Sequence, residues 1–183
     1  DGTGTIIADP RTATAELTFT ITPANDGPVQ SVPATPGGVP VAATTTLEDT
    51  VLVFSAGNGN ALTVSDADSA SVTTVVSVVH GTLTITDATT LGGFGATLGG
   101  DGTDTITLSG TPGEVSAALE GLTYTPLADF NTTTPLGGGT AETLTITTDD
   151  GEGEANSVST DTVAIGVAAV ADLVDDAVTT NVD

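Results

Sequence analysis

The sequence lacks cysteine, lysine and tryptophan, and it contains a single arginine, Arg11, and a single histidine, His80. Without cysteine the chain can form no disulfide, and with one histidine and no thiol it can build no ordinary zinc site. One cationic residue against 24 acidic residues gives a formal net charge of −23. Nucleic acids and anionic membrane surfaces are bound through cationic side chains, so neither is expected as a partner.

Catalytic motifs are missing as well. His80 precedes Gly81, a pair typical of a hairpin turn, and no serine occupies a strand-to-helix nucleophile motif. The glycine-rich stretches are not followed by lysine, which phosphate-binding loops require. No apolar run is long enough to cross a membrane as a helix, and no secretion signal is recognisable. We therefore expect a non-enzymatic protein that does not insert directly into a membrane, and we interpret the chain as an excerpt of a longer one.

The sequence does contain many short alternating runs. Apolar residues make up 38% of the chain, and they alternate with threonine, which suits an exposed pleated surface. The predicted strands, separated by Gly/Asn/Asp turns, are residues 15–22, 51–54, 62–64, 73–79, 82–86, 105–108, 122–125, 143–148 and 162–167. This pattern predicts an all-β protein, an antiparallel Ig-like or cadherin-like β-sandwich.

One segment has a helical pattern. Thr111 can cap a helix, Pro112 suits the first helical position, Glu114 can complete a capping box, and Gly121 can end the helix. Val115 and Leu119 would then face the core. We expect one short crossover helix at about residues 111–121.

The two ends of the chain resemble pieces of one repeating unit. Asp1-Gly2-Thr3-Gly4 is echoed by Asp150-Gly151-Glu152-Gly153, and each is followed by a strand pattern that ends in an aspartate. Self-similarity of this kind is typical of tandem arrays. The predicted organisation is therefore residues 1–27 as the last strand of a preceding repeat (or a donated strand), residues 28–171 as a complete repeat with a proline-rich linker at 28–43, and residues 172–183 as the start of the next repeat.

Acidic residues gather at the ends of the predicted strands. Closely spaced carboxylates in loops repel one another unless a cation neutralises them, and oxygen ligands in flexible loops suit Ca²⁺ better than Mg²⁺. Asp and Asn are also common in solvated turns, which is the alternative interpretation. The candidate metal ligands are Asn25, Asp26, Glu48, Asp49, Asp66, Asp68, Asp149, Asp150 and Asp172.

The order of several motifs resembles the cadherin-like repeats of giant bacterial adhesins secreted with RTX-type signals. The matching segments are Asn25-Asp26-Gly27-Pro28-Val29, Leu47-Glu48-Asp49-Thr50, Val64-Ser65-Asp66-Ala67-Asp68, His80-Gly81-Thr82-Leu83-Thr84-Ile85, Leu122-Thr123-Tyr124-Thr125-Pro126, Asp129-Phe130-Asn131 and Leu144 through Gly151. The resemblance implies a sandwich with Ca²⁺ at the junctions between repeats: Asn25 and Asp26 as linker ligands, Glu48 on the first strand, Asp66 and Asp68 as an internal pair, and Asp149 and Asp150 facing the joint. Asp172 takes the place of Asp26 at the far junction, where Ala171 stands in place of the asparagine.

These observations lead to one functional expectation and one alternative. The first is an extracellular, cell-surface spacer repeat of an adhesin or biofilm protein, made rigid by calcium ions at its contacts with neighbouring repeats. The alternative is a self-assembling subunit of a filament or surface layer, in which residues 1–27 add a strand to a like chain. A carbohydrate-binding sandwich is disfavoured, because the chain has one tyrosine, no tryptophan and few other aromatic platforms.

Overall fold

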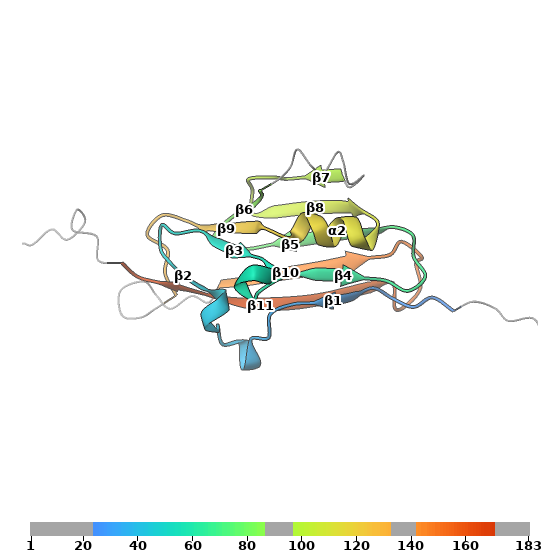
Figure 1. Ribbon diagram of the computed structural model, residues 1–183, viewed down its shortest axis with the longest axis horizontal. Helices are drawn as coiled ribbons and strands as arrows, with labels where there is room; N and C mark the ends of the chain where they lie inside the picture. Colours follow the sequence, from blue (N-terminus) through green and yellow to red (C-terminus); the bar gives the residue numbers. More distant parts are fainter. Residues whose placement is uncertain (1–23, 87–96, 133–141, 171–183) are drawn as a thin grey trace, which may run out of the picture.

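The fold was determined from a computed structural model, which describes residues 24–86, 97–132 and 142–170. These residues form an elongated β-sandwich with one α-helix (Figure 1). The all-β prediction with a single short helix is confirmed. The predicted strand at residues 15–22 and the predicted repeat fragment at 172–183 lie outside the described residues.

The larger sheet has six strands in the order β2-β11-β10-β5-β8-β7. Its strands are β2 (Thr45–Leu47), β11 (Val158–Ala168), β10 (Glu142–Asp149), β5 (Val72–Ser77), β8 (Thr105–Gly110) and β7 (Thr97–Gly99). All neighbours pair antiparallel except β2 and β11, which run parallel. The prediction of a purely antiparallel sandwich therefore needs this one correction.

The second layer contains a three-stranded sheet and a two-stranded ribbon. The sheet has the order β3-β9-β6, with β3 (Leu52–Phe54), β9 (Leu122–Pro126) and β6 (Gly81–Ile85), and the ribbon pairs β1 (Val29–Ser31) with β4 (Thr63–Ser65). The early chain thus changes partners, since β1 pairs with β4 while β2 pairs with β11. Three one-turn 3₁₀ segments complete the described elements: η1 (Pro36–Gly38), η2 (Ala42–Thr44) and η3 (Ala56–Asn58).

The segment expected to be a proline-rich linker, residues 28–43, is part of the sandwich. It contributes β1, and Val32 packs against the core. The Thr35 hydroxyl accepts a hydrogen bond from the Ala164 N–H at 3.3 Å, which ties the segment to β11. Its prolines break the strand between β1 and β2, because proline has no N–H to donate to a ladder. The break allows the change of partner.

Helix α2 (Pro112–Leu119) forms where the sequence predicts it. The Thr111 hydroxyl accepts from the Glu114 N–H, and the Glu114 carboxylate accepts from the Thr111 N–H at 2.7 Å, which completes the capping box. Val115, Ala118 and Leu119 are buried in the core. The Ser116 hydroxyl accepts from the Val64 N–H and donates to the Val64 carbonyl, each at 2.8 Å, so the helix satisfies a free edge of β4.

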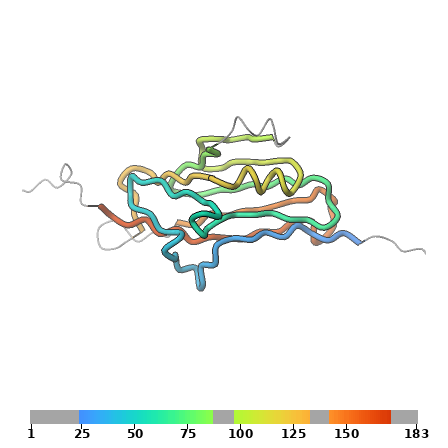
Figure 2. Tube along the Cα trace, viewed as in Figure 1, coloured from blue at the N-terminus to red at the C-terminus, as the bar shows by residue number. Residues whose placement is uncertain are grey.

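The core lies between the two layers and follows the alternation of the strands. Phe54, Leu83, Ile106, Tyr124 and Ile146 are completely buried, and threonines occupy most of the intervening positions. The described chain starts and finishes at opposite ends of the long axis (Figure 2). The sandwich therefore has an N-terminal end, made of residues 24–28, 66–69 and 149–157, and a C-terminal end, made of residues 47–51, 78–81, 127–132 and 168–170.

Candidate metal sites at the two ends of the sandwich

The N-terminal end brings three predicted acidic segments together. Residues 24–28 lead into β1, residues 66–69 follow β4, and residues 149–157 connect β10 to β11. The Asn25 amide donates to Asp150 Oδ2 at 2.9 Å, and the Asn156 amide donates to the Asn25 carbonyl. A Cβ at position 27 would overlap the Asn156 carbonyl oxygen, so Gly27 allows this close approach. The structure thus places Asn25 beside Asp150, although 125 residues separate them along the chain.

Asp66 and Asp68 form the second part of this end. Asp66 Oδ1 accepts from the N–H groups of Asp68 at 3.1 Å and Ser69 at 2.7 Å, a local turn that these side chains commonly make. The Asp68 carboxylate accepts from the Asp26 N–H at 3.2 Å. Asp66 Oδ2 is buried and has no hydrogen-bond partner among the described residues. A buried carboxylate oxygen without a partner is costly, so this oxygen is suited to a cation.

Asp149 and Asp150 end strand β10. Asp149 Oδ1 accepts from the Gly151 N–H at 2.8 Å, and Asp150 Oδ1 accepts from the Glu152 N–H at 2.9 Å. Burial raises the pKa of Asp150. Hydrogen bonds from the Asn25 amide, the Glu152 N–H and the Ser157 hydroxyl lower it by more than burial raises it, so the pKa of Asp150 lies below its usual value. Asp150 is therefore ionised in the folded protein at neutral pH.

No protein cation compensates this end within the described residues. Its carboxylates are Asp26, Asp66, Asp68, Asp149, Asp150, Glu152 and Glu154, whereas the chain's single Arg or Lys, Arg11, lies outside the described residues. A hollow of about 610 Å³ is lined by Asn25, Asp68, Glu152, Glu154 and Asn156. The side chains that line the hollow offer carboxylate and amide oxygens, which are the kinds of ligand that Ca²⁺ prefers.

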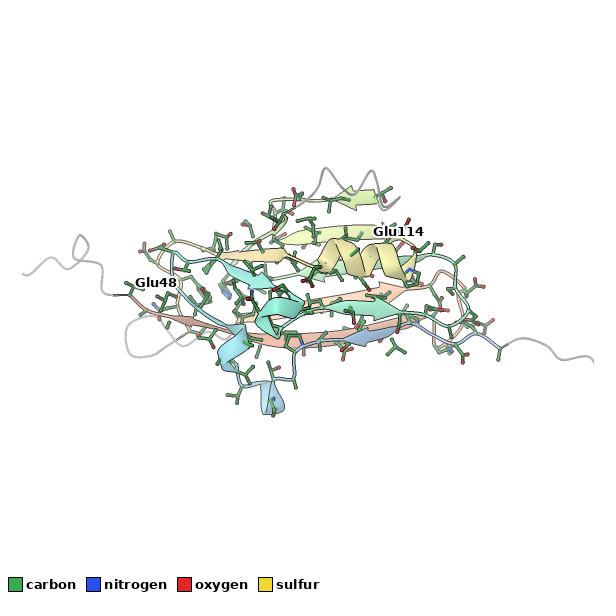
Figure 3. All side chains as sticks on the ribbon, viewed as in Figure 1. Glu48 and Glu114 are labelled. Atoms are coloured by element: carbon green, nitrogen blue, oxygen red, sulfur yellow. The ribbon has the colours of Figure 1, made fainter. Side chains whose placement is uncertain are left out.

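Glu48 and Asp49 lie at the opposite end. Strand β11 connects the two ends, since its first residue pairs with Asp149 and its last pairs with Leu47, a span of about 33 Å at the usual strand rise. Figure 3 shows Glu48 near the point where β11 ends. Glu48 is 9% exposed, and its oxygens accept from the Val170 N–H at 2.6 Å and the Asn131 amide at 3.3 Å. Asp49 is exposed, in a turn with φ of 62°.

The predicted ligands therefore do not form one site. Six of them lie at the N-terminal end, two lie at the C-terminal end, and Asp172 lies outside the described residues. Among the residues that the structure describes, no three acidic or histidine side chains are grouped closely enough to hold a metal ion. The candidate ligands are thus divided between the two ends of the sandwich.

Glu142 is a further buried carboxylate, and it was not among the predicted site residues. It is completely buried and accepts from the N–H groups of Val79, His80 and Thr143 at 3.1, 2.6 and 2.8 Å. The Tyr124 hydroxyl approaches Glu142 Oε2 at 3.4 Å, and His80 Nδ1 lies 3.2 Å from the same oxygen, at ion-pair distance but without hydrogen-bond geometry. The burial of Glu142 could have been predicted from the sequence, because position 142 alternates with the buried apolar positions 144 and 146 on the same side of the strand.

Glu142 organises the C-terminal end through His80. The imidazole stacks on the Phe130 ring with centroids 4.3 Å apart and planes at 4°, and Phe130 is followed by Asn131, which binds Glu48. His80 is therefore more than a turn residue, since it joins the loop at 78–81 to the loop at 127–132. A Cβ at Gly81 would overlap the Tyr124 ring, which explains the glycine that follows His80.

Comparison with known proteins does not place this chain in a group. No family model matches the sequence, and no curated protein matches it. Across the described ranges, none of the helical segments has the length and apolar character that crossing a membrane requires.

Proposed function

We propose that the chain is a calcium-stiffened spacer unit of an extracellular surface adhesin or biofilm protein. The observation that carries the proposal is the N-terminal end, where seven carboxylates lie on three neighbouring segments with no protein cation among the described residues, and Asp66 Oδ2 is buried without a hydrogen-bond partner. A divalent cation removes both problems, because it neutralises repelling charges and coordinates the free oxygen. The resemblance to cadherin-like adhesin repeats supports the same interpretation.

The positions of the chain ends support a linear array. The described chain enters at the acidic N-terminal end and leaves at the C-terminal end, beside Glu48 (Figure 2). Units joined in this direction bring the partial ligand set of one end against the partial set of the next. Ca²⁺ bound at the N-terminal end of one unit, and contacted there by the C-terminal end of its neighbour, holds the units in one orientation, so the array projects outward as a rod.

The test is a thermal melt of the chain in millimolar CaCl₂ and in excess chelator at fixed ionic strength, with MgCl₂ as the second control. Binding to the folded state alone adds roughly 1–4 kcal/mol per site, depending on affinity. We expect a rise in melting temperature with Ca²⁺ that Mg²⁺ does not reproduce, because Mg²⁺ retains its waters and requires a stricter octahedral geometry.

Two variants locate the effect. Asp66→Asn removes the unpartnered oxygen's charge and is expected to reduce the Ca²⁺-dependent rise. Asp161→Asn removes the same charge from β11, between the two ends, and is expected to retain the full rise. Equal melting temperatures in Ca²⁺ and chelator, or equal losses in the two variants, would contradict the proposal.

A further inference from the structure

The last residues of β11 are held from both sides at the C-terminal end of the sandwich. On one side the final three residues of the strand pair with β2, and the Glu48 N–H donates to the Ala168 carbonyl at 2.9 Å. On the other side the Thr132 N–H donates to the Val167 carbonyl at 2.8 Å, and the Val167 N–H donates to the Thr132 hydroxyl at 2.9 Å. The strand is therefore fixed as far as Ala168.

Glu48 extends this hold beyond the end of the strand. The Val170 N–H donates to Glu48 Oε1 at 2.6 Å, and the Asn131 amide donates to Glu48 Oε2 at 3.3 Å. Glu48 thus contacts the departing chain at two points, at Ala168 through its backbone N–H and at Val170 through its side chain. Because Glu48 is only 9% exposed, water competes little for these hydrogen bonds.

Asn131 is itself held by the residues on either side of it. Phe130 stacks on the His80 ring with centroids 4.3 Å apart, and Thr132 is hydrogen-bonded to Val167. The loop at 127–132 is therefore anchored both to the loop at 78–81 and to β11. Asn131 is presented to Glu48 from a fixed position.

We propose that Glu48 is a positioning residue that fixes the direction in which the chain leaves the sandwich, and that its hydrogen bonds achieve this without a cation. The contacts of Glu48 with Ala168, Val170 and Asn131 are named the exit clamp. Two points of attachment along the departing chain define a direction, whereas one point would leave the chain free to swing. The resemblance to adhesin repeats implies a calcium ligand at this position, and the exit clamp gives Glu48 a role of a different kind. Its functional value rests on the proposed spacer, which transmits a direction only if its exit is fixed.

Amide hydrogen exchange of the chain in excess chelator tests the clamp at the level of one bond. We expect the Val170 N–H to be protected, and Glu48→Ala to speed its exchange by about tenfold or more, because the loss of a buried acceptor opens the exit locally. Glu48→Gln keeps an acceptor oxygen for Val170, so exchange should speed up by about threefold at most. Asp49→Ala is the matched control, since it removes the exposed neighbouring carboxylate, and it should leave the exchange unchanged. The amide of Val163, in the middle of β11, establishes that each variant retains the fold.

A distance measurement tests whether the clamp fixes a direction. The chain has no cysteine, so spin labels attached through Val170→Cys and Thr105→Cys are the only ones introduced. Thr105 is exposed at the start of β8 and provides a reference point on the larger sheet. In chelator we expect a single narrow distribution of label distances, because the exit is held without a cation. Glu48→Ala should broaden the distribution, and Asp49→Ala should not.

Four results would overturn the proposal. They are Val170 exchange in chelator as fast as in the unfolded chain, equal acceleration by Glu48→Ala and Asp49→Ala, equal acceleration by Glu48→Ala and Glu48→Gln, and a narrow distance distribution that Glu48→Ala retains. Protection of Val170 that appears only when Ca²⁺ is added would likewise show that a cation fixes the exit. The calcium melt tests the opposite end through Asp66→Asn, so either proposal can fail while the other stands.

Discussion

At the scale of single residues, two buried carboxylates with different surroundings shape the C-terminal end. Glu142 is held by three backbone N–H groups deep inside the sandwich, and Glu48 is held by the Val170 N–H and the Asn131 amide at its rim. In both cases the N–H donors replace the hydrogen bonds to water that the carboxylate loses on burial. His80 and Phe130 connect the two positions, so polar contacts around two buried carboxyl groups organise this end.

The Tyr124 hydroxyl lies beside the buried Glu142 carboxyl group. Burial raises the pKa of the Tyr124 hydroxyl well above its usual range, and the charge and hydrogen bond of Glu142 raise it further. A raised folded-state pKa contributes stability that is complete below the unfolded pKa of about 10 and is lost as the pH rises toward the folded value. The free energy of unfolding is therefore expected to fall above about pH 10.

The chain's single tyrosine makes the measurement direct. We expect the near-ultraviolet absorbance of tyrosinate to appear together with the loss of circular dichroism during an alkaline titration. The urea-unfolded chain serves as the control and should titrate at the ordinary pKa of about 10. Tyrosinate that forms at that same pH while the fold persists would show that Tyr124 is not buried against Glu142.

At the scale of elements, helix α2 owes its position to a local signal and a tertiary one. The capping box of Thr111 and Glu114 is encoded within four residues. The contacts of Ser116 with both backbone groups of Val64 depend on β4, which lies 52 residues away. The helix is short, and Val115 and Leu119 bury its inner side. Its stability therefore combines the cap with burial in the core.

A substitution at the helix cap tests how much the capping box contributes to the stability of the fold. Thr111→Ala is expected to reduce the free energy of unfolding by about 1 kcal/mol, because the Glu114 N–H loses its acceptor. Urea denaturation should show a lower midpoint with an unchanged slope.

A double-mutant cycle provides the control for the cap. Glu114→Ala alone should also destabilise, and the double variant should lose less than the sum of the two single losses, since the two side chains act as one unit. Strict additivity would mean that the reciprocal hydrogen bonds contribute nothing.

Strand prediction from alternation succeeded where the strands are long enough to show a period. β5, β6, β8, β9, β10 and β11 each contain at least five residues, and each overlaps a predicted strand. β1, β2 and β7 were missed, whereas β3 and β4, which also have three residues each, overlap predicted strands; a strand this short shows too little alternation to be consistently distinguished from a turn. Asn25 and Asp150 were both proposed as ligands, but their pairing depends on contacts between distant segments and no local pattern encodes it.

At the scale of the whole molecule, charge and hydroxyl groups are segregated. Most of the described carboxylates lie in loops, many of them at the two ends, and the outward faces of both sheets carry threonine and valine. The crowded carboxylates therefore form two separate groups, one at each end of the sandwich. The elongated shape, with the ends separated by β11, keeps them apart (Figure 1).

This distribution predicts a response to simple salt. Raising NaCl from about 10 mM to about 1 M shortens the screening length from about 30 Å to about 3 Å, so repulsion among the crowded carboxylates falls. We expect the melting temperature in chelator to rise across this range. A melting temperature that falls or stays constant would show that the acidic ends impose no strain on the fold.

The calcium increment measured at high NaCl separates screening from binding. Coordinated Ca²⁺ should still raise the melting temperature in about 1 M NaCl, because a ligand set makes short contacts that salt screens little. An increment that vanishes there would indicate that Ca²⁺ acts only as a counterion.

The sequence by itself determined the all-β class, the longer strands, the helix with its cap and the excess of negative charge, because each depends on residues a few positions apart or on composition alone. The tertiary structure decided the change of partner between β1 and β2, the parallel pairing of β2 with β11, the burial of Glu142 beside His80 and the division of the acidic pairs between two ends. These depend on which distant strands meet and in which register. Local pattern does not encode that choice, since it is settled by packing of the whole core.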